Sequence, residues 1–144
     1  MIPLRIQLLT ETAKVPRYQT EHAAGLDLHA DISAPLQIPA GERRLISTGI
    51  AVAIPVGFEG TVRPRSGLAT REGAATVLGT IDADYRGEVK ILLCAIGDEA
   101  VIVRPGDRIA QLVVSPVARV LQEVVVDLGA TKRGANGFGS TGAR

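Results

Sequence analysis

The chain has 144 residues, a formal net charge of +1 and 22% charged residues, so its length suits one domain with a single core. This charge excludes a strong overall attraction to nucleic acid or to an anionic membrane, and any recognition of an anion must be local. The apolar runs are interrupted within about ten residues, well short of the roughly 20 that a membrane-spanning helix requires, and the N-terminus lacks the pattern of a signal peptide. We therefore expect a cytosolic protein that binds no nucleic acid and no membrane. Cys94, the only cysteine, is expected to be a small buried core residue.

Short segments rich in Val and Ile recur between Gly and Pro residues along the chain, and this spacing predicts an all-β sandwich or barrel. The predicted strands cover residues 4–9, 25–30, 44–55, 58–64, 88–96, 100–105, 108–117 and 120–126. One short helix is predicted at residues 66–72, where Gly73 provides a C-terminal stop. We expect a single domain with a core over residues 1–127 and a flexible, Gly-rich tail over residues 128–144.

The segment "GLDLHAD", residues 25–31, alternates apolar and polar residues. In a strand, Leu26 and Leu28 would be buried, and Asp27, His29 and Asp31 would share the opposite face. Three possible ligands at this spacing suit a metal site, but a half-exposed strand has the same pattern. For His29 we favour the simple exposed face.

The segment "PRSGLA" places Arg65 directly before Ser66 and Gly67 at the predicted helix start. Free backbone N–H groups, a hydroxyl and a guanidinium together suit an anion, most often a phosphate. Taken alone, the segment fits a serine N-cap beside a solvated arginine somewhat better.

The segment "GTIDADYRGEVKI" contains Asp82 and Asp84 separated by one residue. In an extended strand both carboxylates would face one side and Tyr85 the other, so that a carboxylate could bind a metal or orient a water molecule. A turn through these residues would break that geometry, and a polar turn is about as well supported by the local sequence.

The last segment singled out is "RGANGFGSTG", which surrounds Phe138 with glycines. Its glycines permit close approach to a ligand, its polar side chains can donate to phosphate oxygens, and the ring offers a face for a nucleobase. Ordering ten such residues costs on the order of 10 kcal/mol, whereas one base stack returns ~1–3 kcal/mol. The tail should therefore close only over a ligand that also supplies several phosphate contacts.

Five motifs in order, "AGLDLHAD", "PRSGLA", "GTIDADYRGEV", "GDRIAQLVV" and "RGANGFGSTG", resemble those of the homotrimeric deoxyuridine triphosphate nucleotidohydrolases, the dUTPases. The resemblance spans nearly the whole chain. It implies a distorted jelly roll, a homotrimer in which three subunits share each active site, and magnesium-dependent hydrolysis of dUTP to dUMP and pyrophosphate. Such an activity keeps uracil out of DNA and supplies dUMP for thymidylate synthesis.

The resemblance also implies roles for single residues. Asp82 matches the carboxylate that orients water for attack at the α-phosphate, Tyr85 the aromatic residue beneath the deoxyribose, and Asp27 the carboxylate that reaches magnesium through water. Uracil would be read by backbone groups just before Asp82. The other implied substrate contacts are Arg65, Ser66, Gly67, Thr80, Ile81, Lys90 and Gln111, and in the tail Arg133, Phe138 (stacked on uracil), Gly139, Ser140 and Thr141.

Two positions depart from the family pattern. Bacterial members often have a longer hairpin before the Gly-x-Ile-Asp segment, with an Asn that contacts base or sugar; here Leu78 leads straight to Gly79. In the tail, Asn136 stands where glycine is common, a change that we expect to be mild because Asn tolerates positive φ. Two alternatives remain open: a dCTP deaminase, which resembles the same fold, and a dUTP-binding regulator without turnover.

Overall fold

The computed structural model describes residues 2–136 of the chain. It contains ten strands and one short helix within that range. The strands are β1 Arg5–Leu8, β2 Leu26–His29, β3 Leu36–Ile38, β4 Arg43–Ala53, β5 Phe58–Arg63, β6 Ala74–Thr76, β7 Gly79–Ile81, β8 Glu88–Ala95, β9 Val101–Val103 and β10 Arg108–Pro116, and the helix is α1 Ser66–Glu72. No helix in this part of the chain is long and apolar enough to cross a membrane.

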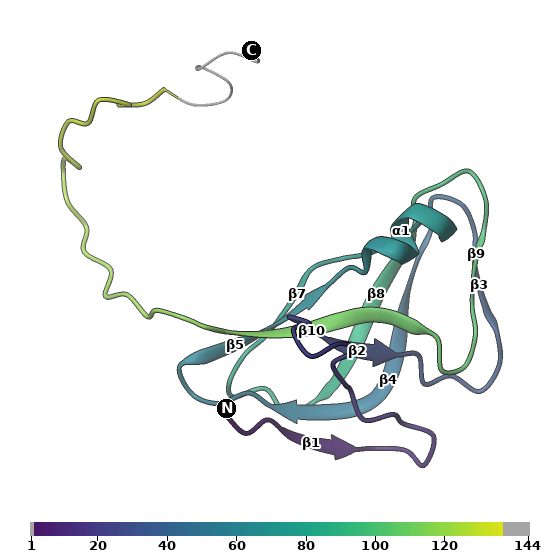
Figure 1. The fold of residues 1–144 in the computed structure, drawn as a ribbon. Helices are drawn as coiled ribbons and strands as arrows, with labels where there is room; N and C mark the ends of the chain where they lie inside the picture. Colours follow the sequence, from purple (N-terminus) through teal and green to yellow (C-terminus); the bar gives the residue numbers. More distant parts are fainter. Residues whose placement is uncertain (1, 137–144) are drawn as a thin grey trace.

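Two antiparallel four-stranded sheets form the body, with strand orders β1-β4-β8-β6 and β2-β10-β5-β7, and β3 and β9 form a separate two-stranded ribbon (Figure 1). The core combines side chains from both sheets, such as Leu28 and Leu112 from one and Ile46 and Leu93 from the other, all at most 1% exposed. This arrangement is a jelly roll, and it confirms the predicted all-β class.

The alternation of side chains along β8 explains how one strand serves both the core and the surface. Val89, Ile91 and Leu93 are buried, while Lys90 between them is exposed. Because successive side chains of a strand point to opposite faces, every second residue enters the core. The sequence-predicted strand over residues 88–96 is thereby confirmed, apart from its last residue.

The helix α1 has the predicted bounds, and it ends at Gly73, which has a left-handed φ of 60°. Its N-cap, however, is Arg65 rather than a serine, and no side chain caps it. Ser66 is the first helical residue, so the serine N-cap considered from the sequence is wrong. Because the first N–H groups of a helix have no partner within it, the start of α1 leaves donors available.

The segment 120–126 is not a strand in the described part of the chain, contrary to prediction. After β10 the chain leaves the body as an extended arm, residues 117–136 (Figure 1). Its apolar side chains lie in solvent, with Leu121 96% and Val124 99% exposed. A strand requires a pairing partner, and residues 120–126 have none among residues 2–136, which is why a β-type sequence stays unpaired here.

Three shorter strands and one residue also differ from expectation. The strands β3, β6 and β7 are not among the predicted strands, since three residues are too few for a period to be recognised. Cys94, predicted to be buried, is only half-buried because it lies on the outer face of β8.

Candidate functional site

A pocket of about 540 Å³ lies where the chain passes from one sheet to the other, between β7 and β8. Five of the sequence-predicted site residues line it together: Thr80, Ile81, Asp82, Tyr85 and Lys90. The rest of the lining is Leu45, Val62, Gly79, Glu88 and Val89. The structure thus brings a carboxylate, an aromatic ring and a cation into one cavity, and we call it the Asp82 pocket.

The residues between β7 and β8 form a turn, which is the second of the two geometries considered from the sequence. The Tyr85 N–H donates to the Asp82 carbonyl at 3.1 Å, and Arg86 donates to the carbonyls of Ala83 and Tyr85 at 2.8 and 2.7 Å. Asp82 and Asp84 therefore do not share a strand face. The Asp82 carboxylate is exposed at the pocket and free to meet a ligand.

The segment before Asp82, expected as a hairpin, is built differently. Its two strands pair with other strands rather than with each other: β6 pairs with β8, and β7 pairs with β5. The linking residues Val77 and Leu78 are 45% and 67% exposed. In the described part of the chain β7 is the edge strand of its sheet, so its outer backbone N–H and C=O groups have no strand partner.

A second pocket, of about 260 Å³, surrounds Asp27 and contains the remaining predicted residues of the body: Arg65, Ser66, Gly67 and Gln111. We call it the Asp27 pocket. Gln19, Ala23, Gly25 and Arg108 complete its lining. It shares no lining residue with the Asp82 pocket, so the structure separates the predicted site residues into two groups.

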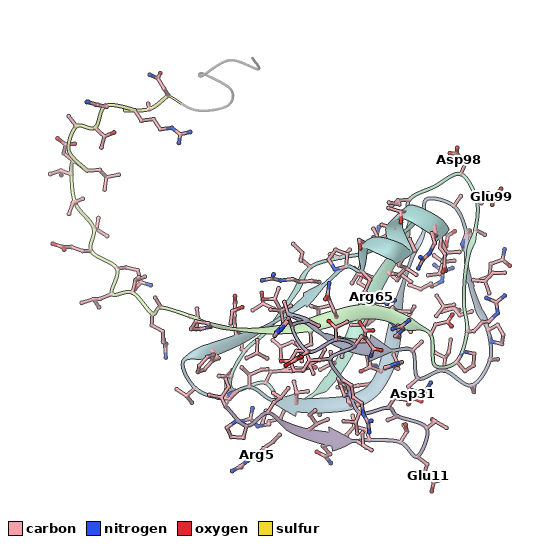
Figure 2. The ribbon with its side chains drawn as sticks, viewed as in Figure 1. Arg5, Glu11, Asp31, Arg65, Asp98 and Glu99 are labelled. Carbon is pink, nitrogen blue, oxygen red and sulfur yellow. The ribbon has the colours of Figure 1, made fainter. Side chains whose placement is uncertain are left out.

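Asp27 is held by two arginines. Its carboxylate oxygens lie 3.2 Å from Arg65 Nε and 3.1 Å from an Arg108 guanidinium nitrogen, and Arg65 also donates to the Arg108 carbonyl at 3.0 Å. Figure 2 shows Arg65 beside β10. Asp27 is only 5% exposed, which corrects the half-exposed strand considered from the sequence: the outward face of β2 is covered by these arginines.

Gln111 lies opposite Asp27 in the pairing of β10 with β2, and its side-chain amide donates to the Pro64 carbonyl at 3.0 Å. A Cβ on Gly25 would come within 2.4 Å of the Gln111 side-chain oxygen. A side chain at position 25 would therefore force the Gln111 side chain to move from this close approach. Sequence reasoning missed Arg108, although a basic residue three positions before Gln111 was the available signal.

The other two polar residues of the segment 25–31, His29 and Asp31, do not form a metal site with Asp27 in the described structure. Asp31 accepts hydrogen bonds from the hydroxyls of Thr10 and Thr12 at 2.5 and 2.6 Å. The buried Nδ1 of His29 has no partner in the described structure, and burial, followed by the nearby Lys14 cation, lowers the His29 pKa. Within residues 2–136, no three His, Cys, Asp or Glu side chains are grouped to hold a metal ion.

The tail residues are only partly described. Arg133 lies on the extended arm, where its Nε donates to the Asn136 carbonyl at 2.9 Å, and it lines neither pocket. The remaining predicted tail contacts, Phe138, Gly139, Ser140 and Thr141, lie outside the described residues. Their roles, and the division of the chain at residues 127 and 128, stay predictions.

An all-β jelly roll with one pocket built around a carboxylate and an aromatic ring, and another around arginines, defines a protein equipped for a ligand with anionic groups. The family model for dUTPase matches residues 11–142 of the chain. The chain therefore belongs to the dUTPase family.

Named members of the family are similar to the chain over almost its whole length. The chain is 50% identical over 143 residues to the deoxyuridine 5'-triphosphate nucleotidohydrolase of Syntrophotalea carbinolica, covering 98% of this chain and 97% of that protein. It is 56% identical over 131 residues to the protein of the same name from an Anaeromyxobacter species, covering 90% and 88%. Among solved structures, the dUTPase of Staphylococcus bacteriophage 80alpha with dUPNHPP superposes with a TM-score of 0.87 at 26% identity, covering 99% of both chains.

Proposed function

We propose that the chain hydrolyses dUTP to dUMP and pyrophosphate, with Asp82 as the general base that orients water for in-line attack at the α-phosphate. The observation that carries this proposal is the Asp82 pocket, in which the exposed carboxylate stands beside Tyr85 and Lys90. A positioned carboxylate acting as general base contributes roughly 10²- to 10⁴-fold in rate. The family membership supports the same reaction.

The base and the sugar would be read by neighbouring parts of this pocket. The free outer edge of β7 at Thr80 and Ile81 supports a backbone readout of uracil, because a narrow backbone slot can exclude the amino group of cytosine and the methyl group of thymine. Tyr85 would pack beneath the deoxyribose and leave no room for a 2′-hydroxyl. Its ring lies directly over Gly87, where a Cβ would come within 2.4 Å of the tyrosine oxygen.

The phosphates would be bound in the Asp27 pocket by Arg65, Ser66, Gly67 and Gln111. Guanidinium and amide donors with free helix N–H groups suit phosphate oxygens. The described residues offer no directly ligating metal cluster, so the donors fit magnesium only if phosphate and water supply most of its ligands, as this ion prefers. A carboxylate has about four acceptor positions, so Asp27 can accept from water while it holds both arginines. Magnesium bound in this way would neutralise phosphate charge and favour in-line attack.

A homotrimer with shared active sites would join the two pockets. Within one chain, the proposed general base and the proposed phosphate contacts lie in different pockets. In a trimer, the Asp82 pocket of one subunit could face the Asp27 pocket of a neighbouring subunit. The arm exposes a row of apolar side chains that a partner would bury: Val120, Leu121, Val124, Val126 and Leu128. The tail, with Phe138 stacked on uracil and with Arg133, Gly139, Ser140 and Thr141 near the substrate, would then close over the site.

Pyrophosphate release from dUTP, dCTP, dTTP and UTP, with and without magnesium, tests the proposal. We expect release from dUTP alone and only with magnesium. Ammonia release from dCTP at a comparable rate would instead indicate a deaminase. Tight dUTP binding without pyrophosphate formation would indicate a regulator, and either result would overturn the proposed function.

A further inference from the structure

Glu88, the first residue of β8, lines the Asp82 pocket but was not singled out from the sequence. Its side chain is 21% exposed and makes two contacts. Oε1 accepts a hydrogen bond from the backbone N–H of Gly49 at 3.0 Å, and Oε2 lies 3.4 Å from Lys90 Nζ. Glu88 therefore connects β4 to the pocket at the point where the turn ends.

The Gly49 contact falls where the pairing of β4 with β8 is irregular. The register shifts between Ser47, which pairs with Lys90, and Ala51, which pairs with Glu88. Gly49 lies in this interval with a left-handed φ of 66°, and a Cβ there would collide with Asp31. Residue 88 is paired with Ala51, at the end of this irregular interval. The Glu88 side chain adds a second link to β4, because it accepts from the Gly49 N–H inside the interval where the ladder is interrupted.

The backbone of Glu88 in turn holds Tyr85. The Tyr85 hydroxyl donates to the Glu88 carbonyl at 3.0 Å. Tyr85 as a whole residue is 44% exposed, so this bond and the packing of the ring over Gly87 hold a largely open side chain. A chain of contacts thus runs from the Gly49 N–H through Glu88 to the tyrosine ring.

We propose that Glu88 is a positioning residue for sugar discrimination: its bond to Gly49 fixes the carbonyl that holds the Tyr85 ring. This inference rests on the proposed function, in which that ring excludes a 2′-hydroxyl. The Lys90 contact is not the operative one, because Lys90 is 46% exposed and a solvent-exposed ion pair contributes little. The side chain at position 88 must therefore be long enough to accept a hydrogen bond from Gly49, and its negative charge is not needed.

Two variants separate reach from charge. Glu88→Gln keeps the length and an acceptor oxygen but loses the charge, whereas Glu88→Asp keeps the charge but is one methylene too short for Gly49. We expect the ratio of kcat/KM for dUTP to that for UTP to stay at the wild-type level in Glu88→Gln. In Glu88→Asp we expect it to fall about tenfold, the effect of losing one hydrogen bond. Glu59→Ala, a half-buried glutamate on β5 that does not line the pocket, is the control and should leave the ratio unchanged.

The position of the Tyr85 ring can also be measured without any enzymatic turnover, because the chain has few aromatic residues. The chain has two tyrosines and no tryptophan, so in a Tyr18→Phe background Tyr85 alone gives the near-ultraviolet circular dichroism of tyrosine. That signal should weaken in Glu88→Asp and persist in Glu88→Gln, with a thermal melt confirming that each variant is folded.

The outcomes are distinct. Absence of dUTP hydrolysis by the unaltered protein would overturn the proposed function, and the tyrosine signal would still test the link from Glu88 to Tyr85. A loss of discrimination in Glu88→Gln but not in Glu88→Asp would show that charge is operative and would overturn the inference. So would an unchanged ratio and an unchanged tyrosine signal in both variants.

Discussion

Replacing Asp27 with asparagine removes the negative charge that Arg65 and Arg108 share. The Asp27 side chain is 8% exposed, and the arginines are 24% and 44% exposed. Breaking a fully buried pair costs roughly 3–5 kcal/mol; these arginines can turn to water, so we expect the free energy of unfolding to fall by about 1–3 kcal/mol. For a chain of 144 residues this lowers the Tm by about 3–12 °C.

The same substitution, although it lowers stability, should strengthen the binding of anions. In the free protein the Asp27 carboxylate competes with any incoming anion for the two guanidinium groups. We therefore expect pyrophosphate to bind Asp27→Asn about tenfold more tightly than the unaltered protein without magnesium, a difference of about 1.4 kcal/mol. Titration calorimetry in the presence of a chelator measures this affinity. Magnesium-dependent turnover of dUTP should fall.

Asp31→Asn is the matched control, because that carboxylate accepts bonds from Thr10 and Thr12 and forms no arginine pair among the described residues. It should lower the Tm and leave the affinity for pyrophosphate unchanged. If pyrophosphate bound Asp27→Asn no more tightly than the unaltered protein, the carboxylate would not mask the arginines and the reasoning would be wrong.

Two single substitutions, one double substitution and one deletion test the other roles. Asp82→Asn should bind dUTP normally in a calorimeter while kcat falls by about 10²- to 10⁴-fold; an unchanged kcat would remove Asp82 from the mechanism. Deleting residues 131–144 should leave the melt and the sedimentation profile intact while kcat collapses, whereas loss of the proposed trimer would place assembly contacts in the tail. Tyr85→Ala should lower the dUTP-to-UTP ratio of kcat/KM by roughly tenfold or more, and an unaffected ratio would mean that the sugar is read elsewhere. Leu121→Asp combined with Val124→Asp should sediment as a monomer if the arm mediates the proposed trimer, and sedimentation as a trimer would exclude that role.

Local patterns in the sequence were sufficient for most of the fold. The alternation in residues 88–95 follows from the strand period alone, and Gly73 marks the end of α1 because glycine adopts a positive φ without strain. The arm over residues 120–126 could not be recognised in this way. Its β-type residues indicate a strand, but whether a strand forms depends on a partner that sequence periodicity does not specify.

The candidate site was predictable where its residues are neighbours in sequence. Thr80, Ile81, Asp82 and Tyr85 come together because one turn places them at one pocket. The burial of Asp27 was not predictable, because the arginines that cover it come from positions about 40 and 80 residues further along the chain. The part played by Glu88 is invisible to pattern analysis for the same reason: its contact lies on β4, across an irregular register.

The exposed arm also has a consequence for aggregation. A segment with four valines, a leucine and a single charge between residues 120 and 126 suits cross-β stacking when it stays uncovered. In the proposed trimer a docked arm would be withdrawn from such contacts, so assembly and aggregation would compete for the same segment.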